Sequence, residues 1–183
     1  MLVLGGRVIL DNGASISVDG DYSSTYIHPR APSRSPIHDS VPGEFTADYH
    51  EACLVLADSP KASAALSRRC LQHLLREKAR VKRGDLSKEI DEAMPNLPSH
   101  LAEAIDAVRN VGNFAAHPNK STSTGEVVNV EPGEAEWLLD TLEGLFDYYF
   151  AQPAILQAKR DALNAKLADT GKPELKSAGA EEA

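Results

Sequence analysis

Residues 43–75 read GEFTADYHEACLVLADSPKASAALSRRCLQHLL, and their apolar side chains recur at steps of three and four residues. That period places the apolar side chains of each segment on one face of an α-helix. Ser59 followed by Pro60 predicts an N-cap and a first helical position, so a second helix begins there. The predicted inner faces are Phe45, Tyr49, Ala52, Cys53 and Leu56 on the first helix, and Ala62, Ala65, Leu66, Cys70, Leu74 and Leu75 on the second.

Helical periodicity continues beyond this hairpin. The second helix is predicted to run to about Val81 and to be ended by Gly84, and the fourth to end near Gly112, because glycine readily adopts the left-handed C-cap conformation. A short third helix is predicted with Leu86, Ile90 and Met94 on its inner face. A fourth begins at Ser99, with Leu101, Ile105 and Val108 facing inward. A fifth starts at Glu134, and its predicted inner residues are Leu138, Leu142, Leu145, Phe146 and Tyr149, with Trp137 also interpreted as core. The expected fold class is mainly α, an up-and-down helical bundle over residues 44–150.

The two ends of the chain differ from the bundle. Residues 1–27 predict a small N-terminal β-hairpin appendage, because Asn12-Gly13 separates two β-prone runs. Residues 28–43 are rich in proline and serine and predict an extended linker. A C-terminal helix is expected over residues 151–169, followed by a disordered tail over residues 170–183.

Composition is ordinary for a globular protein, with 25% charged and 42% hydrophobic residues. No apolar run approaches the ~20 residues that a membrane-spanning helix needs. The first residues lack the basic and long apolar segments of a secretory signal. Two cysteines are too few for a disulfide framework. We therefore expect a cytoplasmic protein without a membrane partner.

Charge is distributed unevenly along the chain. The formal net charge is −8, yet residues 61–88 hold nine basic and two acidic residues, a local balance of +7 that leaves −15 for the remainder. An acidic protein with one basic face is compatible with a confined phosphate-binding groove. The alternative is a solvated basic helix that pairs with acidic neighbours, of which the acidic face of the fifth helix is the strongest candidate.

Three stretches carry a resemblance to a known family. They are DYHEA at residues 48–52, AALSRRCL at residues 64–71 and VRNVGNFAAHP at residues 108–118. Their order and spacing resemble the bacterial domain-of-unknown-function 4145 family over roughly residues 41–150. That family is similar to the HEPN superfamily (higher eukaryotes and prokaryotes nucleotide-binding), whose members are helical bundles often found as dimers. Many of them are metal-independent RNases of toxin–antitoxin and antiviral systems.

The resemblance implies a candidate active site of Arg109, Asn110 and His117, with Glu51, Arg69 and Asn113 as candidate binding or structural residues. Seven residues separate Arg109 from His117, more than in the motif of active HEPN enzymes, and this departure puts catalysis in doubt. Arg109 has a second interpretation, as the partner of Glu51 across the bundle. Arg69 is likewise expected to be a buried partner of Glu51.

RNA cleavage without a metal needs a proton acceptor for the ribose hydroxyl, a proton donor for the leaving oxygen and positive charge beside the phosphorus. Histidine can transfer protons near neutral pH, and arginine can bind two phosphate oxygens at once. One such set is sparse for two proton transfers, so the enzyme hypothesis requires a homodimer that brings two sets together.

Two functions therefore stay open. One is a HEPN-like, non-catalytic module of a bacterial defence or stress system that binds nucleic acid, a nucleotide or a partner protein, such as a subunit of a restriction or toxin–antitoxin system. The other is a homodimeric, metal-independent endoribonuclease that uses Arg109, Asn110 and His117. Neither needs a cofactor. We expect no metal site, because Cys53 and Cys70 fall on the apolar stripes and are offset along the two helices.

Overall fold

The computed structural model describes the backbone of residues 2–4, 7–11, 15–19, 24–26, 34–116 and 130–176. Side chains are described over residues 34–109 and 130–176. The chain divides into two compact units, residues 1–33 and 34–183. In the first unit β1 (Leu2–Leu4) pairs antiparallel with β4 (Ser24–Tyr26), and β2 (Arg7–Asp11) pairs antiparallel with β3 (Ser15–Asp19). The turn predicted at Asn12 and Gly13 lies outside the described residues.

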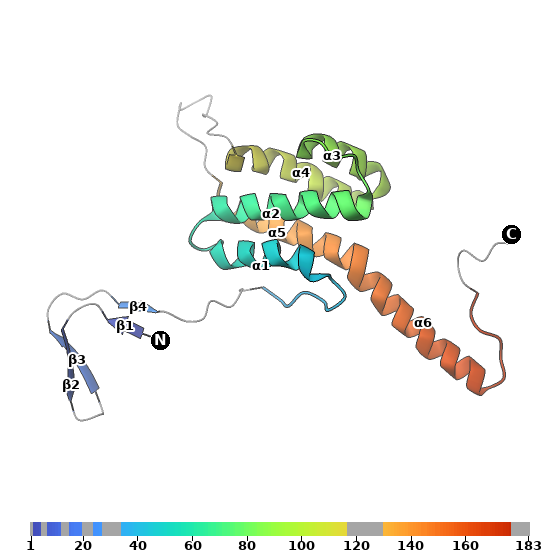
Figure 1. The fold of residues 1–183 in the computed structure, drawn as a ribbon, viewed down its shortest axis with the longest axis horizontal. Helices are drawn as coiled ribbons and strands as arrows, with labels where there is room; N and C mark the ends of the chain where they lie inside the picture. Colours follow the sequence, from blue (N-terminus) through green and yellow to red (C-terminus); the bar gives the residue numbers. More distant parts are fainter. Residues whose placement is uncertain are drawn as a thin grey trace. The chain divides into compact units, whose positions relative to one another are not determined.

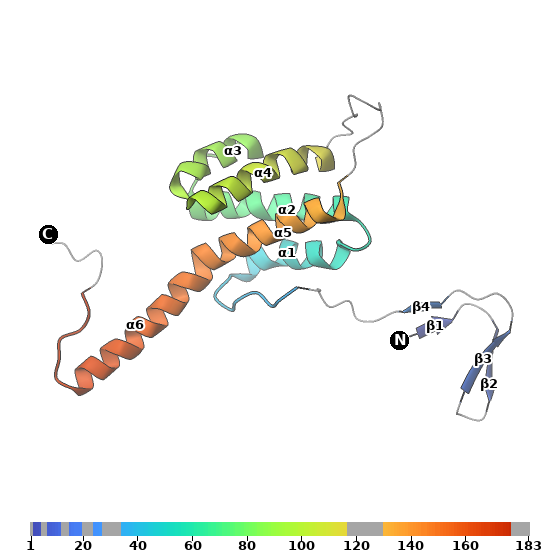
Figure 2. The ribbon, with the colours of Figure 1, turned by 180° about the vertical axis from the view of Figure 1, so that it is seen from behind.

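The second unit is a helical bundle, as predicted for residues 44–150. Its helices are α1 (Gly43–Val55), α2 (Pro60–Leu74), α3 (Leu86–Ala93), α4 (Ser99–Ala116), α5 (Pro132–Phe146) and α6 (Gln152–Asp169). A π-helical turn, η1 (Leu75–Ala79), extends α2, a 3₁₀ turn, η2 (Met94–Asn96), follows α3, and a second π-helical turn, η3 (Asp147–Ala151), joins α5 to α6. In chain order α1, α2, α4 and α5 alternate in direction, and α2 packs on the other three (Figures 1 and 2).

One apolar core joins these helices. Its largest fully buried apolar or aromatic side chains are Tyr49, Leu71, Leu74, Leu75, Ile90, Ile105, Val108, Leu138, Leu139, Leu142 and Leu145. The inner residues predicted for the fourth helix are all buried, and so are all but Tyr149 and Trp137 of those predicted for the fifth. Trp137 was wrongly assigned to the core: it is 48% exposed, and its indole N–H donates to the carbonyl of Ala104 at 3.3 Å.

The inner face of α2 is rotated from the predicted one. Ala65 is exposed, whereas Ser63, Ala64 and Ser67 are fully buried. Small side chains at this position let the backbone of α2 approach its neighbours closely, and packing distance outweighs hydrophobicity there. Gly144 has a similar role on α5, since a Cβ atom at that position would lie 3.0 Å from Leu101 Cδ2 on α4.

Both glycine-based predictions of helix ends are wrong. The second helix ends at Arg80, which adopts the left-handed conformation with φ 57°, and its N–H donates to the carbonyl of Leu75. The next residue, Val81, turns into the core and is 6% exposed, so its burial offsets the roughly 1–2 kcal/mol cost of a left-handed arginine. Helix α4 continues through Gly112 to Ala116, because a glycine inside a helix costs only about 1 kcal/mol.

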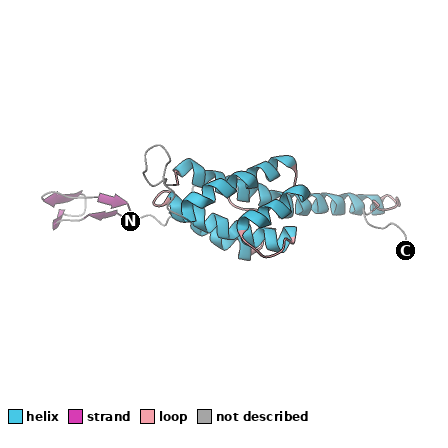
Figure 3. Ribbon diagram, turned by 90° about the horizontal axis from the view of Figure 1, so that it is seen from above, coloured by secondary structure: helices cyan, strands magenta, loops and turns pink. Residues whose placement is uncertain are grey.

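The segments at the two ends of the bundle differ: the one before α1 packs against it, and the one after η3 extends away from it. Residues 34–42 form neither helix nor strand, but Val41 is buried and its N–H donates to the carbonyl of His38 at 2.9 Å. Helix α6 continues the line of α5 beyond the other helices (Figures 1 and 3). Residues 170–176 follow α6, where Arg160 donates to the carbonyl of Leu175 at 2.7 Å.

Within the described part of the chain, no helix is long and apolar enough to cross a membrane.

The N-cap of α2 gives a local stability prediction. Ser59 Oγ accepts the N–H of Ala62 at 3.2 Å, as the sequence predicts, and Pro60 opens the helix. Replacing Ser59 with alanine should lower the free energy of unfolding by about 1 kcal/mol, measured by urea denaturation. Ser87→Ala is the matched control, because the structure gives this half-buried hydroxyl on α3 no cap role. Equal losses in the two variants would contradict the cap.

Candidate functional site

Arg109 lies on α4 and faces α3 rather than α1. Its Nη2 donates to Asp91 Oδ1 on α3 at 2.5 Å and lies 3.2 Å from Asp106 Oδ1 on its own helix. The hydrogen bond to Asp91 raises the pKa of Arg109, and the charges of Asp91 and Asp106 add to it. Arg109 therefore does not pair with Glu51, and two carboxylates already compensate its charge. Asp91 was missed because its exposed position on a short helix carries no local signal.

The other two predicted catalytic residues, Asn110 and His117, and the predicted binding residue Asn113 follow Arg109 along the chain. Asn110 and Asn113 lie within α4, but their side chains are outside the described set, and His117 follows the last described residue of the helix. Because α4 continues to Ala116, the end of the helix lies about 10 Å along the axis from Arg109. A loop from Gly112 was expected to bring His117 back toward Arg109, but residues 113–116 are helical instead. Their meeting stays a prediction.

The two arginines in the middle of α2 have the opposite roles to those expected. Arg69 is exposed and binds Asp48 on α1 through two hydrogen bonds, with Nε donating to Oδ2 at 2.6 Å. Its expected partner, Glu51, is exposed and contributes only a weaker charge interaction to the raised pKa of Arg69, after the hydrogen bond to Asp48. Arg68 is the half-buried one: its Nη1 lacks a hydrogen bond, and burial lowers its pKa.

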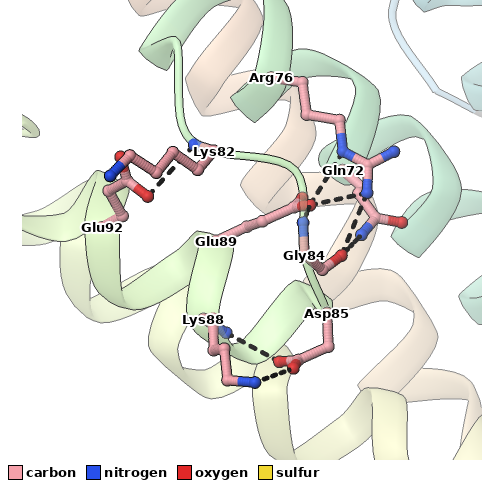
Figure 4. A network of polar contacts seen from close by, with 8 residues as sticks. All are labelled: Gln72, Arg76, Lys82, Gly84, Asp85, Lys88, Glu89 and Glu92. Atoms are coloured by element: carbon pink, nitrogen blue, oxygen red, sulfur yellow. Dashed lines mark hydrogen bonds and ion pairs between the residues drawn. The ribbon is translucent and has the colours of Figure 1, made fainter.

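A buried ion pair organises the connection between η1 and α3, as Figure 4 shows. Glu89 is fully buried, and its Oε1 accepts from Arg76 Nε at 2.9 Å, from Arg76 Nη2 at 2.6 Å and from the N–H of Gly84 at 2.7 Å. Arg76 Nη2 and Gln72 Nε2 both donate to the carbonyl of Gly84 at 3.2 Å. Side chains thus hold both the N–H and the carbonyl of Gly84, although Gly84 does not end the helix.

Two further contacts hold the same connection from outside. Asp85 caps α3 by accepting the N–H of Lys88 at 3.1 Å, and its carboxylate pairs with Lys88 Nζ at 2.8 Å (Figure 4). Glu92 accepts the backbone N–H of Lys82 at 3.2 Å. The backbone from residue 80 to residue 85 is therefore tied to α2 and α3 at several points.

The result is a basic loop, defined here as residues 80–84. Its cationic side chains, Arg80, Lys82 and Arg83, are exposed, while Val81 between them is buried. Within the described part of the chain, none of the three forms an ion pair. Such unpaired cations on a fixed backbone are suited to binding phosphate oxygens. The basic composition of residues 61–88 signalled this region, but not which of its residues are free.

The acidic face of α5 does not pair with the basic residues of α2, contrary to expectation. Asp140 and Glu143 instead bind Arg34, with Nε donating to Glu143 Oε1 at 2.6 Å. Burial alone would lower the pKa of Arg34, but the hydrogen bond and charge of Glu143 outweigh it and raise the pKa. Glu143 Oε1 also accepts from the hydroxyl of buried Tyr49 at 2.5 Å. The acidic face of α5 thus leaves the cations of the basic loop without a partner on that helix.

The cysteines and nearby histidines are dispersed among core contacts. Cys70 Sγ donates to the carbonyl of Phe45 at 3.1 Å, and burial raises the pKa of this thiol to about 12. His73 stacks at 4.8 Å from the ring of Phe45, and burial also raises the pKa of Cys53. Over the described ranges, no three His, Cys, Asp or Glu residues are grouped so that they could hold a metal ion.

Comparison with known proteins gives one match. A family model described as "Domain of unknown function (DUF4145)" matches residues 50–167 of the chain. No curated protein matches the chain, and no solved structure does.

Proposed function

Because this chain belongs to the family of the domain of unknown function 4145, whose description names no activity, we propose a function from the geometry of its charged residues. The chain is a non-catalytic module that binds the phosphate backbone of a nucleic acid through the basic loop. The observation that carries this proposal is the set of three exposed, unpaired cations Arg80, Lys82 and Arg83 on an anchored backbone. No cofactor is required.

The basic loop is a better phosphate site than α2, because the loop backbone is held in place and the loop cations are not committed to carboxylates. Arg69 and Arg76 are committed to Asp48 and Glu89, and Lys88 to Asp85. Lys78 Nζ lies 4.5 Å from the ring centroid of Phe150 and remains exposed at the edge of the loop. Binding through fixed cations costs little conformational entropy and releases counterions from the nucleic acid, which makes the affinity strongly dependent on salt.

The proposal predicts the effect of removing the three loop charges together. The triple variant Arg80→Gln, Lys82→Gln and Arg83→Gln should bind a labelled single-stranded RNA at least about tenfold more weakly than the unmodified chain, measured by fluorescence anisotropy. The slope of log affinity against log salt should fall by about 2, since each lost phosphate contact on a single strand removes about 0.7.

The matched control replaces three exposed cations elsewhere, Lys159, Lys166 and Lys172, with glutamine. Net charge changes equally in the two triple variants, so only a localised site distinguishes them. Equal losses of affinity in both, or no binding of RNA or DNA by the unmodified chain at low salt, would overturn the proposal.

The same assay tests the endoribonuclease hypothesis. The pairing of Arg109 with Asp91 and Asp106 argues against catalysis, because a phosphate would have to displace both carboxylates. We expect the RNA probe to be recovered intact after binding. Cleavage that disappears in His117→Ala would replace the binding proposal with the enzyme hypothesis.

The proposal places the chain in a bacterial defence or stress system as a homodimeric relative of the HEPN superfamily. What supports this part is the resemblance of residues 48–52, 64–71 and 108–118 to the family, together with the helical bundle of the described residues. Light scattering of the purified chain tests the homodimer directly, and a monomer at all concentrations would remove it.

A further inference from the structure

We propose that a cavity beside acidic residues of α5 and η3 binds an alkylammonium or alkylguanidinium group. The cavity has a volume of about 230 Å³, and its lining includes Ile37, Glu143, Phe146, Asp147, Ala151 and Ile155. Its lining residues come from the segment before α1 and from α5, η3 and α6. None of these residues belongs to the basic loop, so the inference is independent of the proposed function.

The wall formed by residues 35–41 is held in place from both ends. Arg34 binds Asp140 and Glu143 on α5, and Val41 is buried in the core. Between them, His38 and Ser40 form a local turn in which the N–H of Ser40 donates to His38 Nδ1 at 3.1 Å. The cavity is thus a built feature of the fold rather than a gap beside a free segment.

Apolar atoms form the floor of the cavity. Phe146 and Ala151 are buried members of α5 and η3, and Ile155 is half-buried on α6. Ile37 packs against the core from the opposite wall. A hydrocarbon stem in contact with this floor would gain roughly 25 cal/mol for each Å² of apolar surface removed from water. The floor therefore selects a ligand with an apolar portion.

The charges around the cavity select a cation. Glu143 and Asp147 are four residues apart on a continuous helical segment, so both carboxylates lie on the face that lines the cavity. Arg34 pairs with Glu143 and with Asp140 outside the cavity, whereas Asp147 accepts from neutral Gln152 Nε2 at 3.2 Å and has no cationic partner among the described residues. No lysine or arginine lines the cavity. Its volume lies below the ~300–1,000 Å³ of pockets for drug-sized ligands, so it suits one side-chain-sized group.

Binding is tested by NMR on the full chain labelled at isoleucine Cδ1 methyl groups. Hexylammonium should shift the methyl signals of Ile37 and Ile155 and leave those of fully buried Ile90 and Ile105 unchanged. Hexanol has a similar apolar stem without the charge and should bind at least about tenfold more weakly, the effect of ~1.4 kcal/mol. Equal affinity for the two probes would overturn the proposal.

A second comparison distinguishes the sources of the cationic group. An acetylated Ala-Lys-Ala amide and its Ala-Gln-Ala counterpart present the same group within a peptide. A lysine peptide that shifts Ile37 and Ile155 more strongly than hexylammonium assigns the cavity to a protein partner, and the reverse order assigns it to a free amine. Either order supports the site, and the absence of shifts with both cationic probes overturns it.

The variant Asp147→Asn removes one cavity charge while keeping the shape of the side chain. It should weaken hexylammonium binding about two- to fivefold, as for the loss of one exposed ion pair. The matched control is Asp169→Asn, which removes an exposed carboxylate at the far end of α6. A second variant, Ala151→Leu, fills the cavity and should abolish the shifts while its methyl spectrum reports a retained fold. Unchanged binding in both Asp147→Asn and Ala151→Leu would sink the site.

Discussion

Replacing Glu89 with alanine should lower the free energy of unfolding by about 3 kcal/mol, measured by urea denaturation. Glu89 is fully buried, and one of its oxygens receives all three donated hydrogen bonds, two from Arg76 and one from the backbone of Gly84. Its removal leaves a partly buried guanidinium and a backbone N–H without their acceptor. The expected loss is at the lower end for buried pairs because the Arg76 side chain retains 28% exposure.

Glu92→Ala is the matched control for this variant. Glu92 lies one turn along α3 and accepts the backbone N–H of Lys82, but it is exposed, so its loss should cost less than about 1 kcal/mol. Arg76→Ala completes a double-mutant cycle with Glu89→Ala, which should give a coupling energy above about 1 kcal/mol. Independent effects of the two changes would show that the pair does not act as a unit.

The Glu89 variant also links stability to the proposed function. Gly84 closes the basic loop, and its position depends on Glu89 and Arg76. If the loop cations bind phosphate as a fixed set, Glu89→Ala should weaken RNA binding at temperatures where the variant is still folded, although Glu89 itself contributes no positive charge. Undiminished binding by a folded variant would show that the loop does not need to be preorganised.

Raising the pH above ~9 should destabilise the protein, because Cys70 and Tyr49 are buried in their neutral forms. Burial raises the pKa of Cys70 to about 12, and burial together with the hydrogen bond to Glu143 raises the pKa of Tyr49. The unfolded chain releases both protons at lower pH than the folded chain. Stability is therefore fully present below the unfolded pKa values and is lost as the pH rises toward the folded ones, with up to about 4 kcal/mol from Cys70.

The measurement is a series of urea unfolding curves between neutral pH and about pH 11. Tyr49→Phe and Cys70→Ala should each reduce the slope of stability against pH above ~9. Tyr148→Phe is the matched control, because Tyr148 is 38% exposed, and it should leave the slope unchanged. Identical alkaline slopes in Tyr49→Phe and the unmodified chain would contradict the assignment for Tyr49.

Helix content and the identity of most core residues were predictable, whereas helix ends were not. Periodicity found Phe45, Tyr49, Ile105 and Leu142 because apolar spacing is a local property of a helix. The helix ends were predicted from glycine, but the burial of Val81 favours a helix end at Arg80 over one at Gly84. Close packing also outweighed the local apolar pattern on α2, where Ser67 is buried and the predicted inner residue Ala65 is exposed.

Charge partners were the least predictable part of the candidate site. Asp91 on α3 binds Arg109, Asp48 on α1 binds Arg69, and Arg34 binds the acidic face of α5. Each pair joins segments at least 18 residues apart, so its formation depends on how the helices pack. The resemblance to the family identified Arg109 and Arg69 as candidate site residues, but a sequence motif does not specify which carboxylates lie beside its arginines.

By itself, the amino-acid sequence determined the class of the fold, the position of most helices, the N-cap at Ser59 and the uneven distribution of charge, because each follows from local propensity, spacing or composition. Only the tertiary structure decided which cations are free. It paired Arg69, Arg76 and Arg109 with carboxylates and left Arg80, Lys82 and Arg83 exposed, since an ion pair requires two side chains that the packing of separate helices brings together.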